Sequence, residues 1–597
     1  MGTIRLLGPP TIEHAGSPVR PPRGRKAWAL LAYLLLADRP PSRKKLAELL
    51  FADADDPLGA LRWTLAELRR ALDAHDVLTG DPVVATLDDR TSVDVLLVTA
   101  ESADPEPLLT LGGELLEGVE VASCPEFASW LLVERQRLSA AIEARLRETA
   151  VSLVACGRAK DAIPYASKAV EINPLEQGNH ELLVRSLAIS GNRQGALRQI
   201  AVCEDLFRRE LGVSASATLK EASSVGPGSL SGPPLSGRAA AASQLEAGRA
   251  AIVAGAVDAG VQCLRRAVAE ADHCRDTVLR GRALAALGGA LVHAIRGHDE
   301  EGAIVLHEAI LVADQAGDRV TSVTAHRELG FVEVQAGRRG TAATWLAKAQ
   351  ALAETDEEQA AILGVRGMNS SDVGDYPAAL EELTESAELA GGCGDRRQQA
   401  WSLSLLGRAH LLRAEHSQAN TIVRESLDLV RQERWIAFLP WPQALKAELD
   451  LVAGDVDAAV DGFEQAWVLG CQLNDPCWEG MAGRGLGMLS AGRGDHAGAT
   501  EWLDQAASRS SREPDRYQWI HAHVLDAAIT TALDRDDDVR AKPLVTQLAA
   551  LAARCDMREL VVRAKLHQAN LGDEQAAGSA RLLAAGIDNP ALTALLH

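Results

Sequence analysis

The chain has 597 residues, too many for a single hydrophobic core, so several domains or a repeat array are expected. The net charge of −21 excludes a generic polyanion binder, although residues 1–72 carry twelve Lys and Arg against seven Asp and Glu. Nine scattered cysteines without a CxxC motif argue against a disulfide framework or structural zinc, and no apolar run suits a membrane span or a secretory signal. We therefore expect a soluble, reduced, cytoplasmic protein.

The first hundred residues alternate between short strand patterns, helix patterns and turns. Strands are predicted at Thr3–Leu7, Thr11–His14, near Val19, at Val77–Leu78, Val83–Leu87 and Val93–Val98. Helices are predicted at Arg23–Ala37, Ser42–Phe51 and Asp55–Leu72. Strands followed by three helices and a hairpin predict a small α+β winged helix-turn-helix domain.

The third of these helices, Asp55–Leu72, is amphipathic and has a clear start. Asp56 can cap it, and Pro57 stands at the first helical position. One predicted buried stripe consists of Leu58, Leu61, Leu65, Leu68 and Leu72. The opposite face consists of Gly59, Trp63, Ala66 and Arg70, with Arg62 on its flank. Such a face fits the major groove of DNA, but an ordinary surface helix with solvated arginines has the same pattern.

A run of three cations, Arg43, Lys44 and Lys45, begins the second helix. Positive charge at a helix start opposes the helix dipole, so another role is needed to explain it. We expect either contacts with DNA phosphates or a solvated helix start.

Several sequence fragments together resemble the SARP family of bacterial transcriptional regulators. They are IRLLG, RKAWALLAYLLLA, SRKKLAELLF, ALRWTLAELRRAL, SVDV, PEFASWLLVERQRL and FRRELGVSASATL. The resemblance implies an OmpR-type winged helix joined to a bacterial transcriptional activator domain (BTAD), which serves dimerisation and activation. It makes Arg62, Arg69 and Arg70 candidate DNA contacts. Relatives tend to read SRLRRAL where this chain has AELRRAL, which predicts that Glu67 would face the phosphates.

Downstream of this region the pattern is almost entirely helical. Gly157 and Gly191 are turn positions 34 residues apart, the period of a tetratricopeptide (TPR) repeat, and Ala162 and Ala196 follow them by five residues. A Gly/Ser/Pro linker precedes the rest of the chain. No Walker A motif is present, so the NTPase domain of many large relatives is not expected. The predicted domains are a winged helix at 1–98, a BTAD at 99–222, a linker at 223–238 and a TPR-like α-solenoid at 239–597.

The solenoid prediction depends on eight turns in register. The turn positions are Gly255, Gly297, Gly337, Gly374, Ala414, Gly454, Gly494 and Asp536. Five residues after each stands a small residue: Gly260, Gly302, Ala342, Ala379, Ala419, Ala459, Ala499 and Ala541. A small residue there lets paired helices approach closely. The pattern predicts stacked helical repeats that form a curved surface.

The solenoid also holds eight of the eleven tryptophans. Trp435 and Trp441 flank a segment with two prolines, and they are candidates for a ligand groove. Packing between helix layers is the favoured alternative. No catalytic, metal-binding or cofactor motif is present, so we expect no enzyme activity and no cofactor.

The sequence is best interpreted as a mainly α, DNA-binding transcriptional regulator, and as an activator by its resemblance. The expected partners are promoter DNA, RNA polymerase, a second copy of the chain, and a protein, peptide or small-molecule effector on the solenoid. If about six phosphates are neutralised, the logarithm of DNA affinity should fall against the logarithm of salt concentration with a slope of about −5. The alternatives are an interaction scaffold whose winged helix no longer binds DNA, and a receptor for a secreted peptide.

Overall fold

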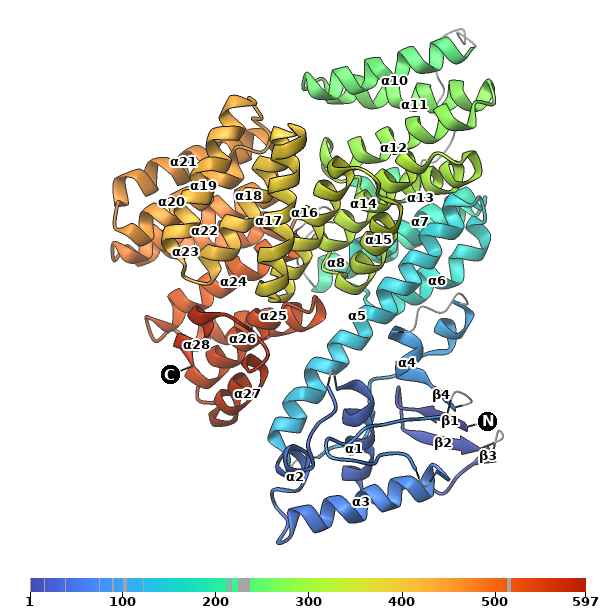
Figure 1. Cartoon of the computed structure of the whole chain (residues 1–597), viewed down its shortest axis with the longest axis vertical. Coiled ribbons are helices and arrows are strands. Elements are labelled where there is room, and N and C mark those ends of the chain that lie inside the picture. Colours follow the sequence, from blue (N-terminus) through green and yellow to red (C-terminus); the bar gives the residue numbers. More distant parts are fainter. Residues whose placement is uncertain are drawn as a thin grey trace. The chain divides into compact units, whose positions relative to one another are not determined.

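The computed structural model confirms a mainly α-helical fold (Figure 1). It describes all residues except 1, 15–16, 38, 75, 89–90, 100–104, 122, 211, 213, 215–216, 224–236, 513–516 and 597. The predicted linker at 223–238 lies almost wholly outside the described residues. The described part contains 28 α-helices, one short 3-10 helix and a four-stranded sheet, and none of its helices has the length and apolar character needed to cross a membrane.

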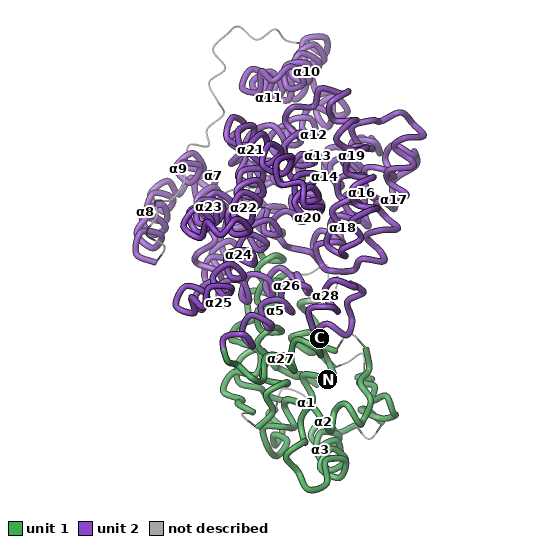
Figure 2. Tube along the Cα trace, turned by 90° about the vertical axis from the view of Figure 1, so that its left-hand side faces the viewer, with its two compact units in different colours: residues 1–146, 572–582 green, residues 147–571, 583–597 purple. Residues whose placement is uncertain are grey.

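The chain folds into two compact units (Figure 2). The N-terminal unit consists of Met1–Leu146 together with Gly572–Leu582. The solenoid unit consists of Arg147–Leu571 together with Leu583–His597. The compact units divide at Leu146, within the region predicted as the BTAD, so they do not test the predicted domain boundaries, which stay predictions.

The sheet of the N-terminal unit has the order β3-β2-β1-β4. Its strands are β1 (Gly2–Arg5), β2 (Thr11–His14), β3 (Ser17–Pro18) and β4 (Thr91–Val93). The first three are antiparallel neighbours, whereas β4 pairs with β1 in parallel, with Val93 opposite Ile4.

The prediction of an extended run at Val93–Val98 is wrong beyond its first residue. Asp94–Thr99 forms helix α4, and η1 (Glu106–Thr110) follows. The buried carboxylate of Asp94 accepts hydrogen bonds from the amides of Leu6 (2.8 Å) and Leu7 (2.8 Å) at the end of β1. It also accepts from the amide of Val95 at 2.7 Å, so it ends the strand and starts the helix.

Three helices pack beside this sheet: α1 (Arg25–Leu36), α2 (Arg43–Phe51) and α3 (Pro57–Ala71). The predicted caps of the second and third are confirmed. The Ser42 hydroxyl accepts from the amide of Lys45 at 3.2 Å, and the Asp56 carboxylate accepts from the amide of Gly59 at 2.8 Å. The hairpin predicted after α3 is reduced to a turn with one antiparallel bridge between Thr79 and Val84.

The next helices cover the region predicted as the BTAD. They are α5 (Pro125–Ala155), α6 (Ala159–Ile172), α7 (Gln177–Ile189), α8 (Arg193–Glu210) and α9 (Ala217–Glu221). Gly157 and Gly191 have the left-handed conformation expected of turns, and Ala162 and Ala196 are fully buried.

The remaining helices form successive pairs. They are α10 (Arg238–Val253), α11 (Val257–His273), α12 (Thr277–His293), α13 (Asp299–Ala316), α14 (Arg319–Gln335), α15 (Arg339–Leu352), α16 (Asp356–Val373), α17 (Tyr376–Cys393), α18 (Arg396–Leu412), α19 (His416–Gln432), α20 (Pro440–Ala453), α21 (Val456–Leu473), α22 (Pro476–Gly492), α23 (His496–Ser510), α24 (Gln518–Leu533), α25 (Asp538–Arg554), α26 (Arg558–Asn570), α27 (Glu574–Ala584) and α28 (Pro590–Leu595).

The repeat register predicted from the sequence is confirmed at every position. All eight turn residues have positive φ, including the two non-glycines Ala414 (59°) and Asp536 (57°). All eight small residues are buried. A Cβ added to Gly260 would lie 2.7 Å from the Ile252 side chain, which shows how closely the paired helices approach.

Within the solenoid unit, α24–α26 and α28 pack against the turns of repeats far upstream. The buried carboxylate of Asp372 (α16) pairs with Arg339 (2.9 Å) and Arg408 (2.8 Å), and the Tyr517 hydroxyl donates to it at 2.8 Å. Burial raises the pKa of Tyr517, which therefore stays a protonated donor. The array thus closes on itself through a buried polar network.

Candidate nucleic-acid interface

Helix α3 has one buried and one exposed face. Leu61, Leu65 and Leu68 are almost fully buried, as predicted, and Leu72 just after the helix is buried too. Leu58 is 50% exposed, so its assignment to the buried stripe is wrong. It lies in the first turn, before the helix reaches the core.

The exposed face holds the residues that the helical pattern placed there. Trp63 is 51% exposed, and the side chains of Arg62 and Arg70 are 69% and 62% exposed. Arg62 has a loose ion pair with Asp56 at 3.7 Å, which water and salt screen strongly. The guanidinium groups of Arg62 and Arg70 are both open to solvent, so each can bind a phosphate or a base edge.

The structure corrects the prediction that Glu67 faces DNA. Glu67 is only 8% exposed, and its carboxylate forms an ion pair with Arg70 three residues later. The acid therefore positions Arg70, and the outer face of α3 has no carboxylate at this position.

Two of the predicted contact residues bind the chain's own backbone. Arg43 donates from Nε to the Gly80 carbonyl at 2.9 Å. Arg69 donates to the carbonyls of Val77 (3.0 Å) and Leu78 (2.7 Å). Both side chains hold the 77–84 turn against α2 and α3, a role that sequence reasoning missed because the turn is distant from α2 in the chain.

The other two cations of the run, Lys44 and Lys45, are exposed at the start of α2. Lys44 lies 3.8 Å from Glu48, and both side chains are open to solvent. Four predicted contact residues, Lys44, Lys45, Arg62 and Arg70, are therefore exposed, while Arg43 and Arg69 are partly buried.

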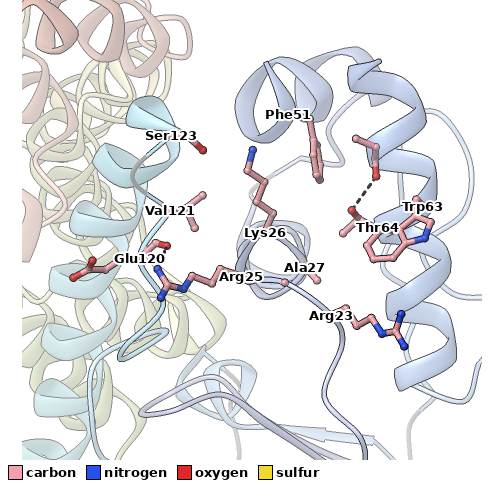
Figure 3. Close-up of a pocket in the computed structure, with 12 residues that line it drawn as sticks. Arg23, Arg25, Lys26, Ala27, Phe51, Trp63, Thr64, Glu120, Val121 and Ser123 are labelled. Atoms are coloured by element: carbon pink, nitrogen blue, oxygen red, sulfur yellow. Dashed lines mark hydrogen bonds between the residues drawn. The ribbon is translucent and has the colours of Figure 1, made fainter. Parts of the chain in front are cut away.

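A pocket of about 540 Å³ lies beside the exposed face of α3 (Figure 3). Its lining includes Arg23, Arg25 and Lys26 around the start of α1 together with Glu120, and Trp63 forms part of its wall. Lys26 pairs with Asp53 at 2.5 Å and holds the pKa of that carboxyl below its usual value. The pocket thus places Arg23 and Arg25 of the α1 start and Trp63 of α3 around one opening.

Of the two candidates for a ligand groove, Trp435 and Trp441, the favoured alternative of packing between helices is confirmed for Trp441. Trp441 is buried in the core, where its indole N–H donates to the Ser404 hydroxyl at 3.1 Å. Trp435 is partly exposed and stacks on Phe438 with ring centroids 4.5 Å apart. Trp441 is therefore a packing residue, and only Trp435 stays a candidate.

A different open groove of about 620 Å³ lies along α19 and α20. Its polar lining includes His416, Asn420, Arg424 and Lys446, and Val452 adds an apolar edge. Among the described residues, no group of three or more His, Cys, Asp or Glu side chains is placed to hold a metal ion.

Residues 107–224 match the model of the bacterial transcriptional activator domain. No curated protein matches the chain. Among solved structures, a Rap protein complexed with competence and sporulation factor is 12% identical (TM-score 0.40) and covers 60% of this chain and 88% of its own.

NprR in complex with its cognate peptide NprX is also 12% identical (TM-score 0.38) and covers 60% of this chain and 98% of its own. Mycobacterium tuberculosis EmbR in complex with a low-affinity phosphopeptide is 18% identical (TM-score 0.29) and covers 37% of this chain and 64% of its own. At these levels of similarity the structures establish no shared function.

Proposed function

We propose that the chain is a DNA-binding regulator of transcription whose N-terminal winged helix reads promoter DNA through α3. The observation that carries the proposal is the outer face of α3, which presents Arg62, Trp63 and Arg70 while Glu67 is turned inward. Arginine at this position of a helix suits bidentate contact with guanine in the major groove. The match of residues 107–224 to an activator domain supports a role as an activator.

In this proposal Lys44 and Lys45 bind phosphates, the 77–84 turn is the wing, and Arg43 and Arg69 hold it in place. The solenoid receives a protein, peptide or small-molecule signal, and the activator domain mediates self-association or contact with RNA polymerase. The cytoplasm is the expected compartment for such a regulator.

Salt dependence tests the proposal. Lys44 and Lys45, each neutralising one phosphate, give a log–log slope of DNA affinity against salt concentration of about −2 per chain, shallower than six contacts would give. Full-length protein should show this slope on its target fragments. Lys44→Ala with Lys45→Ala should remove most of the slope, whereas Arg62→Ala with Arg70→Ala should weaken binding with little change in slope. A flat salt response would contradict DNA binding by this surface.

A second candidate function is an interaction scaffold that does not bind DNA. It is favoured by the half-exposed Trp63 beside an open pocket, because aromatic anchors are typical of protein interfaces. In that case Trp63→Ala should abolish capture of a partner protein, while no genomic fragment is enriched by the wild-type chain.

A further inference from the structure

The penultimate helix, α27, belongs to a different unit from its neighbours in the chain. Gly572–Leu582 is part of the N-terminal unit, whereas α26 before it and α28 after it are part of the solenoid unit. The chain therefore passes from one unit to the other and back within a single short helix.

The docking of α27 in the N-terminal unit is close. Ala576, Ser579 and Ala580 are buried, and the Ser579 hydroxyl donates to the Ser129 hydroxyl of α5 at 3.1 Å. The next residue of α5, Trp130, packs edge-on against Tyr33 of α1 with ring centroids 4.9 Å apart. The part of α5 that contacts α27 is therefore also the part that packs against α1.

The two flanking helices are anchored to the solenoid by buried polar contacts. The Tyr376 hydroxyl at the start of α17 donates to the Glu559 carboxylate of α26, and both side chains are buried. Asn589 donates to the same carboxylate at 2.9 Å and to the Leu412 carbonyl at 3.3 Å.

A second anchor lies at the next turn of the repeats. Arg413, between α18 and α19, donates to the Asp588 carbonyl just before α28. Its side chain also lies 3.6 Å from the Asp588 carboxylate. Both anchors stand on turns between paired helices, whose spacing changes whenever the pitch of a repeat array changes.

We propose that α26–α28 form a clasp that couples the conformation of the solenoid to the N-terminal unit. The anchors at Tyr376 and Arg413 hold α26 and α28, and this keeps α27 docked on α5. A change in the repeats that breaks the anchors releases α27 from α5. The regulatory use of the clasp rests on the proposed function; its mechanics do not.

The docked pair can be tested in the full-length protein by replacing both serines with cysteine. Ser129→Cys with Ser579→Cys should form a disulfide with oxidised glutathione, identified by peptide mapping, because the two hydroxyls are in contact. Each single variant should form no such bridge. Absence of the bridge in the double variant would overturn the docking of α27.

The coupling can be tested through the reactivity of Ser579→Cys alone. A buried thiol reacts with an alkylating reagent only after local opening, so its rate reports the opening equilibrium directly. Adding Tyr376→Phe, or separately Arg413→Ala, should raise the labelling rate by about 10-fold, since each removes a hydrogen bond that involves a charged group. Tyr165→Phe in α6 is the matched control and should leave the rate unchanged.

Unchanged labelling in both Tyr376→Phe and Arg413→Ala would overturn the coupling. Circular dichroism of each variant separates local release from global unfolding. Neither readout uses DNA, so failure of the clasp and failure of the proposed function are distinguishable.

Discussion

Two adjacent arginines on α3 should give opposite results when replaced by alanine. Arg69 donates two hydrogen bonds to backbone carbonyls of the 77–84 turn, at 3.0 and 2.7 Å. Hydrogen bonds from a charged group contribute about 1.5–3 kcal/mol each, and partial exposure places this pair near the lower end. Arg69→Ala should therefore lower the free energy of unfolding of the N-terminal unit by about 2–3 kcal/mol.

Arg70 is mostly exposed, and its ion pair with Glu67 contributes at most about 1 kcal/mol. Arg70→Ala should leave stability nearly unchanged and weaken DNA binding by about 1–3 kcal/mol if the side chain reads a base. The assay combines hydrogen exchange of residues 77–84 with DNA titration of both variants. Loss of DNA affinity without faster exchange in Arg69→Ala would refute the assignment of Arg69 to the turn.

Three further predictions concern stability. Leu61→Ala should cost about 2–5 kcal/mol in chemical denaturation, whereas Leu58→Ala should cost under 1, and equal costs would contradict the orientation of α3. Gly337→Ala should lower the melting temperature more than Gly454→Ala. Both residues have positive φ, but only at Gly337 would an added Cβ collide with a neighbour, the Cys555 sulfur at 2.5 Å. Equal melting temperatures of the two variants would contradict this. Burial raises the pKa of Glu181 to about 7, so its contribution to stability is present below its unfolded value of 4.5 and is lost as the pH rises through 7. The free energy of unfolding of Glu181→Gln, measured in urea titrations, should rise by about 3 kcal/mol relative to that of the wild type between about pH 4.5 and about pH 8. A constant difference between the two proteins over this pH range would contradict the prediction.

Local features of the fold could be predicted from the sequence because their causes are local. The caps at Ser42 and Asp56 each depend on four consecutive residues. The left-handed turns follow from single residues such as Gly255 and Gly454, and the buried small residues follow from their fixed distance to those turns. A repeating pattern adds many weak local signals into one strong signal.

Features that depend on distant residues could not be predicted. Whether Glu67 faces solvent or the core depends on where the helix packs, since a helical wheel places it closer to the exposed face than to the leucine stripe and yet it is buried. Tyr376 and Glu559 are 183 residues apart, and no sequence pattern pairs them. The sequence favoured packing over an exposed anchor for both Trp435 and Trp441, but it could not tell which of them lies in the core, and only Trp441 does so fully.

The central claim is that the outer face of α3 binds specific DNA. The most direct measurement is enrichment of genomic fragments by the full-length protein and by the variant with Arg62→Ala and Arg70→Ala. Arg158→Ala is a matched control, because Arg158 is an exposed arginine in a similar pair with Asp161 outside this helix. We predict that the wild type and the control enrich the same few sites and that the double variant enriches none of them. Equal enrichment by all three proteins would contradict the assignment of this surface to DNA.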